Sequence, residues 1–141
     1  DAALPIGVAA AGLLNPTTGA SIAANLPSHG QKFHRDLEAE CNAALTLIND
    51  CRAFVQAEAR FGSGSQTSCM LGIVLGTGVG GAIAINGCLV NNGHGQSGEF
   101  GHLPMPAETV AQHKLPLLIC GCGRKGCYET LASGPDTPRY V

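Results

Sequence analysis

Four side chains that commonly bind metal ions lie in the last third of the chain. They are His102, Cys120, Cys122 and Cys127, and the three cysteines fall within eight residues. Three thiolates and one imidazole complete a tetrahedral zinc site, and a site filled by protein ligands is typical of structural zinc. The alternative is a disulfide or free thiols. Cysteines separated by a single residue are poorly placed for a disulfide, so the pattern favours one structural Zn²⁺.

Two glutamates flank this cluster. Glu99 precedes His102 by three residues, and Glu129 follows Cys127 by two. Glutamates are mostly solvated at protein surfaces, which is the simplest interpretation of both. If a metal ion joins His102 to the cysteine loop, both carboxylates are instead held near the same spot. They would then form a polar pocket that accepts hydrogen bonds from a hydroxyl-rich ligand.

A glycine-rich loop, Gly76-Thr77-Gly78-Val79-Gly80-Gly81, lies between two predicted strands. Gly76, Gly78 and Gly81 satisfy G-x-G-x-x-G, but a dinucleotide-binding loop of that type opens a helix, and here a strand follows. Closely spaced glycines expose backbone N–H groups that bind anions, and Thr77 adds a hydroxyl donor. The loop alone is equally compatible with phosphate binding and with a plain turn.

Asn49-Asp50 is a further polar feature, placed where a predicted buried strand meets a predicted helix. Ligands bind at such corners in α/β folds. Either residue can also cap the helix that follows. The two roles do not exclude each other.

Hydrophobic patterning predicts the elements that must position these residues. Strands are expected over residues 4–11, 21–25, 45–48, 69–75, 82–85 and 88–90, and helices over 33–44 and 52–61. Asn86-Gly87 is a hairpin signal. Residues 105–118 carry three prolines and are expected to form a loop, and 135–141 show no pattern. The unclustered cysteines are expected to be buried as small apolar residues; they are Cys41, Cys51, Cys69 and Cys88.

Composition argues against several classes of function. The chain has 141 residues, a net charge of −2 and 13% charged residues, so nucleic acid is not an expected partner. No apolar run is long enough to span a bilayer, and no signal peptide is recognisable, so no membrane partner is expected either. Seven cysteines without a secretory signal favour a reducing compartment, and the expected location is the cytoplasm.

Together these motifs resemble those of the ROK family of sugar kinases. The shared motifs occur in the family's order: Asn49-Asp50, residues 75–81, Gly98-Glu99-Phe100-Gly101-His102, and the cysteine block from Cys120 to Glu129. The resemblance covers about residues 6–134 and implies an α/β fold of the actin-like, hexokinase-type (ribonuclease H-like) class with a zinc-binding loop. Residues 1–49 would be the C-terminal part of the small domain, and residues 50–141 the N-terminal part of the large domain.

The resemblance also implies a role for each motif. Asp50 would be the general base that takes the proton from a sugar hydroxyl, with ATP and Mg²⁺ as co-substrate. The loop from Gly76 to Gly81 would face the transferred phosphate. Zinc would be bound by His102, Cys120, Cys122 and Cys127. Sugar hydroxyls would be bound by Asn25, Asn49, Asp50, Glu99, His102 and Glu129.

Within the family, residues 23–27, 98–104 and 115–117 are most similar to kinases of N-acetylglucosamine. The expected reaction is therefore conversion of N-acetyl-D-glucosamine to its 6-phosphate. The alternatives are a fructokinase, a glucokinase or an N-acetylmannosamine kinase, a sugar-responsive ROK-type repressor, or a zinc-stabilised sugar-binding module without chemistry. A sugar and ATP are the expected partners, and a homodimer is compatible with the sequence.

The chain also departs from the family pattern. Neither the first phosphate loop, Asp-x-Gly-Gly-Thr-Lys, nor the C-terminal half on the adenosine side is found, so we expect part of a longer protein that is inactive alone. Cys51-Arg52 follows Asp50 where two small or polar residues are expected, and Ala82 stands where a third glycine is common. Past Gly134 the similarity to the family is expected to end.

Overall fold

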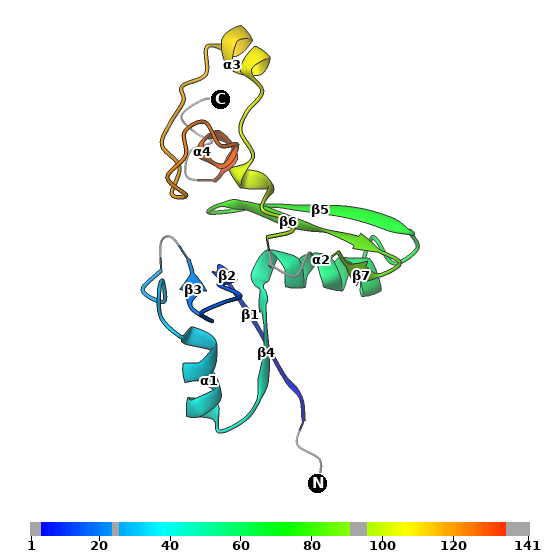
Figure 1. Cartoon of the computed structure of the whole chain (residues 1–141). Helices are drawn as coiled ribbons and strands as arrows, with labels where there is room; N and C mark the ends of the chain where they lie inside the picture. The colour runs from blue at the N-terminus through cyan, green and yellow to red at the C-terminus, as the bar shows by residue number, and fades with distance from the viewer. Residues whose placement is uncertain (1–3, 24–25, 91–95, 135–141) are drawn as a thin grey trace.

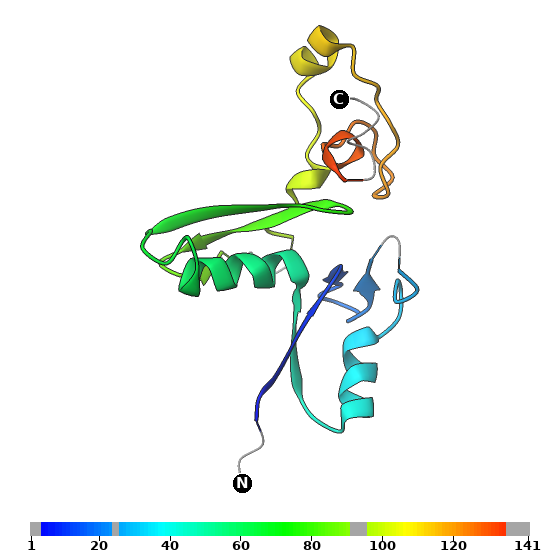
Figure 2. The same ribbon diagram turned by 180° about the vertical axis from the view of Figure 1, so that it is seen from behind.

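The computed structural model describes residues 4–23, 26–90 and 96–134, whose elements follow one another along an elongated molecule (Figures 1 and 2). The first region holds a parallel pair of strands, β1 (Ile6–Ala10) and β4 (Leu45–Asn49), joined through helix α1 (Phe33–Cys41). Such a crossover is the usual way to connect parallel strands. A short antiparallel pair, β2 (Leu13–Leu14) and β3 (Ser21–Ile22), completes this region.

Helix α2 (Asp50–Phe61) begins directly where β4 ends. Asn49 has an extended backbone, and its side-chain oxygen accepts a hydrogen bond from the backbone N–H of Arg52 at 3.2 Å. This is the geometry of a helix N-cap, which satisfies a backbone donor that the helix itself leaves free. The cap therefore fixes Asp50 as the first residue of the helix.

The second region is an antiparallel sheet of β5 (Cys69–Leu75), β6 (Val79–Ile85) and β7 (Cys88–Leu89), with α2 packed on one face (Figure 1). Val55 of α2 is fully buried, and any side chain at Gly72 of β5 would overlap it. Glycine at position 72 therefore allows the helix to lie close to the sheet. The β6–β7 turn has positive φ at Asn86 (49°) and Gly87 (72°), which confirms the predicted hairpin.

The third region packs on the far side of the sheet from α2 (Figure 1). It contains the short 3₁₀ helix η1 (Phe100–His102), helix α3 (Ala107–His113), the cysteine loop and α4 (Glu129–Ala132). The backbone N–H of Tyr128 donates to the carbonyl of Leu103 at 3.0 Å, and the N–H of Gly134 donates to that of Gly76 at 2.7 Å. These bonds bring together η1, the cysteine loop (residues 120–127) and the glycine turn (residues 76–78).

Several predicted boundaries are wrong. Helix α1 ends at Cys41 rather than residue 44, because Asn42 adopts a left-handed conformation (φ 48°). Strand β6 already begins at Val79, so Val79, Gly80 and Gly81 are strand residues and only Gly76–Gly78 form the turn. The two-residue strand β2 and the short helices η1 and α4 were not predicted, since such short elements show no periodicity.

The loop predicted over residues 105–118 contains α3, which the prolines do not prevent. Pro106 occupies the position before the first helical turn, where a missing backbone N–H costs little, and Lys114 ends the helix in a left-handed conformation. The prediction of buried free cysteines also fails. Cys41, Cys69 and Cys88 are exposed, and Cys51 is half-buried.

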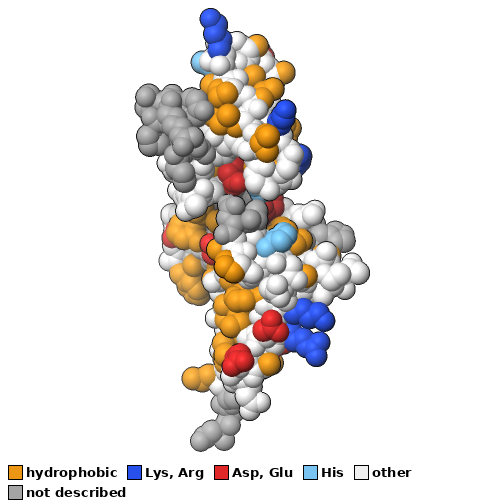
Figure 3. Space-filling view, turned by 90° about the vertical axis from the view of Figure 1, so that its left-hand side faces the viewer, with side chains coloured by type: hydrophobic (Ala, Val, Ile, Leu, Met, Phe, Trp, Pro, Cys, Tyr) orange, Lys and Arg blue, Asp and Glu red, His pale blue; other side chains and the backbone are white. Residues whose placement is uncertain are grey.

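Hydrophobic side chains reach the surface along much of the molecule, and charged ones are sparse on the face drawn in Figure 3. Alternate residues of β5, on the sheet face away from α2, contribute to this apolar surface; they are Leu71, Ile73 and Leu75. Across the described ranges, no helix has the length and apolar character needed to cross a membrane.

Candidate functional site

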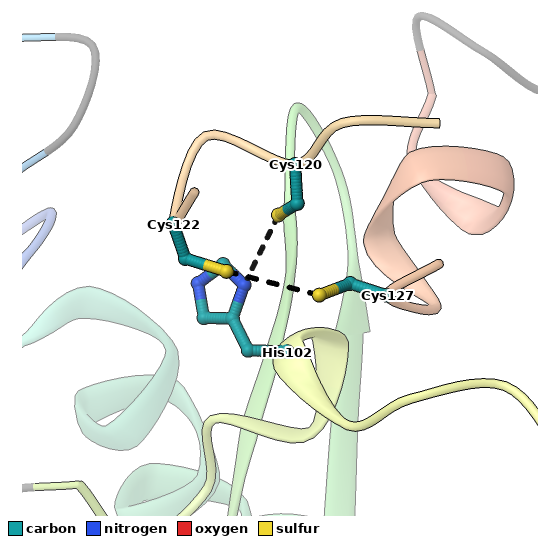
Figure 4. A group of neighbouring side chains, drawn as sticks. All are labelled: His102, Cys120, Cys122 and Cys127. Atoms are coloured by element: carbon teal, nitrogen blue, oxygen red, sulfur yellow. Dashed lines mark hydrogen bonds between the residues drawn. The ribbon is translucent and has the colours of Figure 1, made fainter. Parts of the chain in front are cut away.

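His102 and the three cysteines converge on one point (Figure 4). The Nδ1 atom of His102 lies 3.4 Å from the Sγ of Cys120, and the Sγ atoms of Cys122 and Cys127 lie 3.7 Å apart. All four ligand atoms lie within 4.8 Å of one another. Tetrahedral bonds of about 2.3 Å to sulfur and about 2.1 Å to nitrogen place ligand atoms roughly 3.5–3.8 Å apart. The cluster therefore fits a single tetrahedral metal ion with little rearrangement.

The tight fold of the cysteine loop follows from its glycines. Gly123 and Gly126 have φ values of 84° and 73°, which side-chain-bearing residues rarely adopt. The N–H of Cys120 donates to the carbonyl of Arg124 at 2.8 Å, and the N–H of Gly123 donates to that of Cys120 at 2.9 Å. The chain thus turns back within a few residues, which brings Cys122 and Cys127 side by side.

The three thiols differ in acidity. Burial raises the pKa of Cys120 to about 12 and also raises that of Cys127. Hydrogen bonds from the backbone and side chain of Arg124 lower the pKa of the exposed Cys122 to about 6. Because metals bind thiolates, a cation at this site would displace protons from the two buried thiols.

Two carboxylates flank the imidazole of His102. The Oε2 atom of Glu99 lies 3.6 Å from Nε2, and the Oε1 atom of Glu129 lies 4.0 Å from Nδ1. Burial raises the pKa of Glu99; the imidazole of His102 opposes this, and the charge of Glu129 adds to it. The structure therefore brings both glutamates to one histidine, with Nδ1 toward the thiols and Nε2 facing Glu99.

Glu129 also joins the cluster of His102 and the three cysteines to the glycine turn. Its Oε2 atom accepts a hydrogen bond from the backbone N–H of Val79 at 3.0 Å. A side chain at Gly78 would lie 2.7 Å from the same oxygen, so glycine is needed for this close approach. Thr77 is exposed at the tip of the turn. The predicted phosphate loop therefore lies beside the predicted sugar-binding residues.

Asp50 is exposed at the N-terminus of α2, where its Oδ1 accepts a hydrogen bond from the N–H of Cys51 at 2.9 Å. Its charge contributes to the raised pKa values of Glu99 and Cys51, which places it within electrostatic reach of both. Asn49 donates through Nδ2 to the carbonyl of Gly12 at 3.2 Å and so ties the end of β1 to α2. Asn25 lies outside the described residues.

Sequence reasoning missed the structural part played by Arg52. Its side chain is buried, and Nη1 donates to the carbonyl of Ser97 at 2.6 Å. The sequence did carry one signal of this role: position 52 is an arginine where the family pattern has a small or polar residue. A cavity of about 390 Å³ lies beside it; its lining includes Gly12, Ser21, Phe33, Thr46 and Asn49.

Comparison with known proteins gives a consistent assignment. The profile described as "ROK family" matches residues 1–140, so the similarity does not end at Gly134 as predicted. The N-acetylgalactosamine kinase AgaK of Shewanella sp. (strain ANA-3) is 40% identical over 135 residues, which cover 95% of this chain and 44% of the relative. The N-acetyl-D-glucosamine kinase of Yersinia pestis bv. Antiqua (strain Nepal516) is 36% identical over 132 residues, 92% of this chain and 52% of the relative.

Solved structures of similar fold also come from the ROK family. A ROK family glucokinase from Streptomyces griseus, in complex with glucose and AMPPNP, has a TM-score of 0.79 and 31% identity, covering 96% of this chain and 41% of the other. A ROK family transcriptional regulator, a homologue of the E. coli MLC protein, has a TM-score of 0.70 and 25% identity, covering 96% of this chain and 32% of the other. The fold is therefore that of ROK proteins. The chain spans about half the length of the curated relatives it matches.

Proposed function

This chain belongs to the ROK family, and on that premise we propose that it forms the sugar-binding part of an ATP-dependent sugar kinase. The two curated relatives described above act on N-acetylgalactosamine and N-acetylglucosamine by their names, so we propose an N-acetylhexosamine as substrate. N-acetyl-D-glucosamine, converted to its 6-phosphate, is the first substrate to test. Residues 1–49 and 50–141 are proposed to belong to two domains that meet at this site.

One observation carries the proposal: Glu99 and Glu129 lie on either side of the His102 imidazole, next to the glycine turn. Two carboxylates that accept hydrogen bonds and one imidazole N–H that donates form a set of groups suited to the adjacent hydroxyls of a sugar. Nδ1 of His102 faces the thiols, so Nε2 is the nitrogen that would contact the sugar. Asn49 would add contacts from the N-cap of α2.

Asp50 is proposed as the general base. Within the part of the chain that the structure describes, its carboxylate forms no ion pair. A carboxylate placed beside the attacking hydroxyl contributes about 10²–10⁴-fold to the rate. The cap at Asn49 holds Asp50 on the first turn of α2, where it is exposed.

The Cys₃His cluster is proposed to hold structural Zn²⁺ through His102, Cys120, Cys122 and Cys127. The separations of 3.4 and 3.7 Å fit the ion's tetrahedral bonds. With all four positions filled by protein, bound zinc would supply no Lewis-acid chemistry; it would fix His102 and the cysteine loop. These residues then present Glu129 and the imidazole to the sugar.

Gly76, Thr77 and Gly78 are proposed to face the phosphate that is transferred. The turn is closed by the N–H of Gly76, which donates to the carbonyl of Gly78 at 2.9 Å. A solved ROK glucokinase binds an ATP analogue, which supports ATP, with Mg²⁺, as the phosphoryl donor. Positioning and charge neutralisation are the main tasks of protein groups in such reactions.

Calorimetric titration of the zinc-loaded chain with N-acetylglucosamine tests the proposed site. Glu99→Gln should weaken sugar binding by about 1–3 kcal/mol, the usual cost of losing a charged hydrogen bond. Glu108→Gln, on the outer helix α3, is the matched control and should bind like the wild type. N-acetylgalactosamine and glucose titrations then rank the substrates. Equal affinity in wild type and Glu99→Gln would refute the site.

A further inference from the structure

Arg52 is a buried cation on helix α2, two residues after the proposed base Asp50. It is 7% exposed, and among the described residues it forms no salt bridge. Its guanidinium instead donates through Nη1 to the carbonyl of Ser97 at 2.6 Å and through Nη2 to the carbonyl of Val90 at 3.4 Å. Burying a charged side chain costs free energy unless the charge is hydrogen-bonded. The carbonyls of Ser97 and Val90 must therefore stay beside the guanidinium.

Both acceptors are distant from Arg52 in the sequence. Val90 is 38 residues away and Ser97 is 45 residues away, so the side chain fixes a long-range arrangement. Ser97 comes two residues before Glu99. The guanidinium therefore joins the helix that begins with Asp50 to the segment that carries Glu99.

The same segment is also held against the sheet. Gly98 has a φ of 105°, and any side chain there would overlap the carbonyl oxygen of Gly81 in β6. The N–H of Phe100 then donates to the carbonyl of Gly98 at 2.8 Å as η1 begins. Glu99 thus lies between an anchored backbone and a short helix, and Arg52 supplies the contact to α2.

We propose that Arg52 is a positioning residue for the sugar site, holding Glu99 at a fixed place relative to Asp50. This proposal rests on the proposed function, in which both carboxylates act on one sugar. The planar guanidinium bonds two carbonyls at once, whereas lysine offers a single compact ammonium. Lysine at position 52 would keep the charge but would hold Ser97 and Val90 together less well.

Hydrogen exchange measured by mass spectrometry tests this on the whole zinc-loaded chain. Arg52→Met should speed exchange of the amides in residues 96–103 by roughly tenfold or more, because a charged hydrogen bond is lost. Arg52→Lys should give a smaller increase. Arg60→Met is the matched control, since Arg60 lies on the same helix and donates to the carbonyl of Gly87 at 3.2 Å. It should leave residues 96–103 unchanged.

The pattern of exchange separates positioning from general stability. A positioning role requires that β5 (Cys69–Leu75) exchanges at the wild-type rate in Arg52→Lys. Unchanged exchange in residues 96–103, or an equal increase in β5, would overturn the proposal. Titration with N-acetylglucosamine is the second measurement, and Arg52→Lys should weaken binding more than Arg60→Met does. If the wild type binds no sugar, the proposed function fails, while the exchange data still decide whether Arg52 fixes this segment.

Discussion

Glu129 has a structural role and a proposed sugar-binding role, and two substitutions can separate them. Its Oε2 atom accepts the N–H of Val79, a buried strand residue, and its charge lies beside His102. Glu129→Ala leaves that buried N–H without its acceptor, which should cost about 1.5–3 kcal/mol of unfolding free energy. Glu129→Gln keeps an oxygen at the same reach, so it should cost well under half as much.

Sugar binding should respond differently. Both variants lose the carboxylate charge, and each should bind N-acetylglucosamine about 1–3 kcal/mol more weakly. Urea denaturation gives the stability difference, and calorimetry gives the affinity difference. Glu108→Gln on α3 is the control for a general effect of lost charge. Wild-type stability in Glu129→Ala would refute the inferred link between Glu129 and the glycine turn.

Two further predictions concern the cysteines. Cys122→Ser should reduce bound zinc, measured by atomic absorption, from one ion per chain to near zero and should lower the melting temperature. Cys88→Ser is the control and should retain the metal. Full zinc content in Cys122→Ser would exclude Cys122 as a ligand. Burial, with a further contribution from the charge of Asp50, raises the pKa of Cys51 to about 11 from an ordinary 9.0, so alkylation at pH 8 should be slower there than at the exposed Cys88. Asp50→Asn should lower that pKa and speed alkylation of Cys51; an unchanged rate would contradict the role of the charge.

Much of the framework was predictable because local signals were strong. The bounds of β5 are those predicted, since an apolar run ends at a glycine turn, and Asn86-Gly87 formed the hairpin expected of a type I′ turn. The convergence of His102 with the cysteine loop was also predicted from residue type and spacing. The residue types and spacing therefore indicate the group of His102, Cys120, Cys122 and Cys127 that the structure brings together.

The failures have two physical causes. Helix α3 has 7 residues, which is too short for an apolar helical period to show in its sequence. The contact of Glu129 with Val79 spans 50 residues, and that of Arg52 with Ser97 spans 45. No local pattern encodes such pairs, because tertiary structure alone brings them together.

Release of ADP that depends on N-acetylglucosamine tests the central claim most directly. It should be measured in the longer protein that contains this chain, comparing wild type with Asp50→Asn. Asparagine keeps the size of the side chain but loses its basicity, so turnover should fall by about 10²–10⁴-fold while sugar affinity changes little. Wild-type turnover in Asp50→Asn would contradict the assignment of Asp50 as the base.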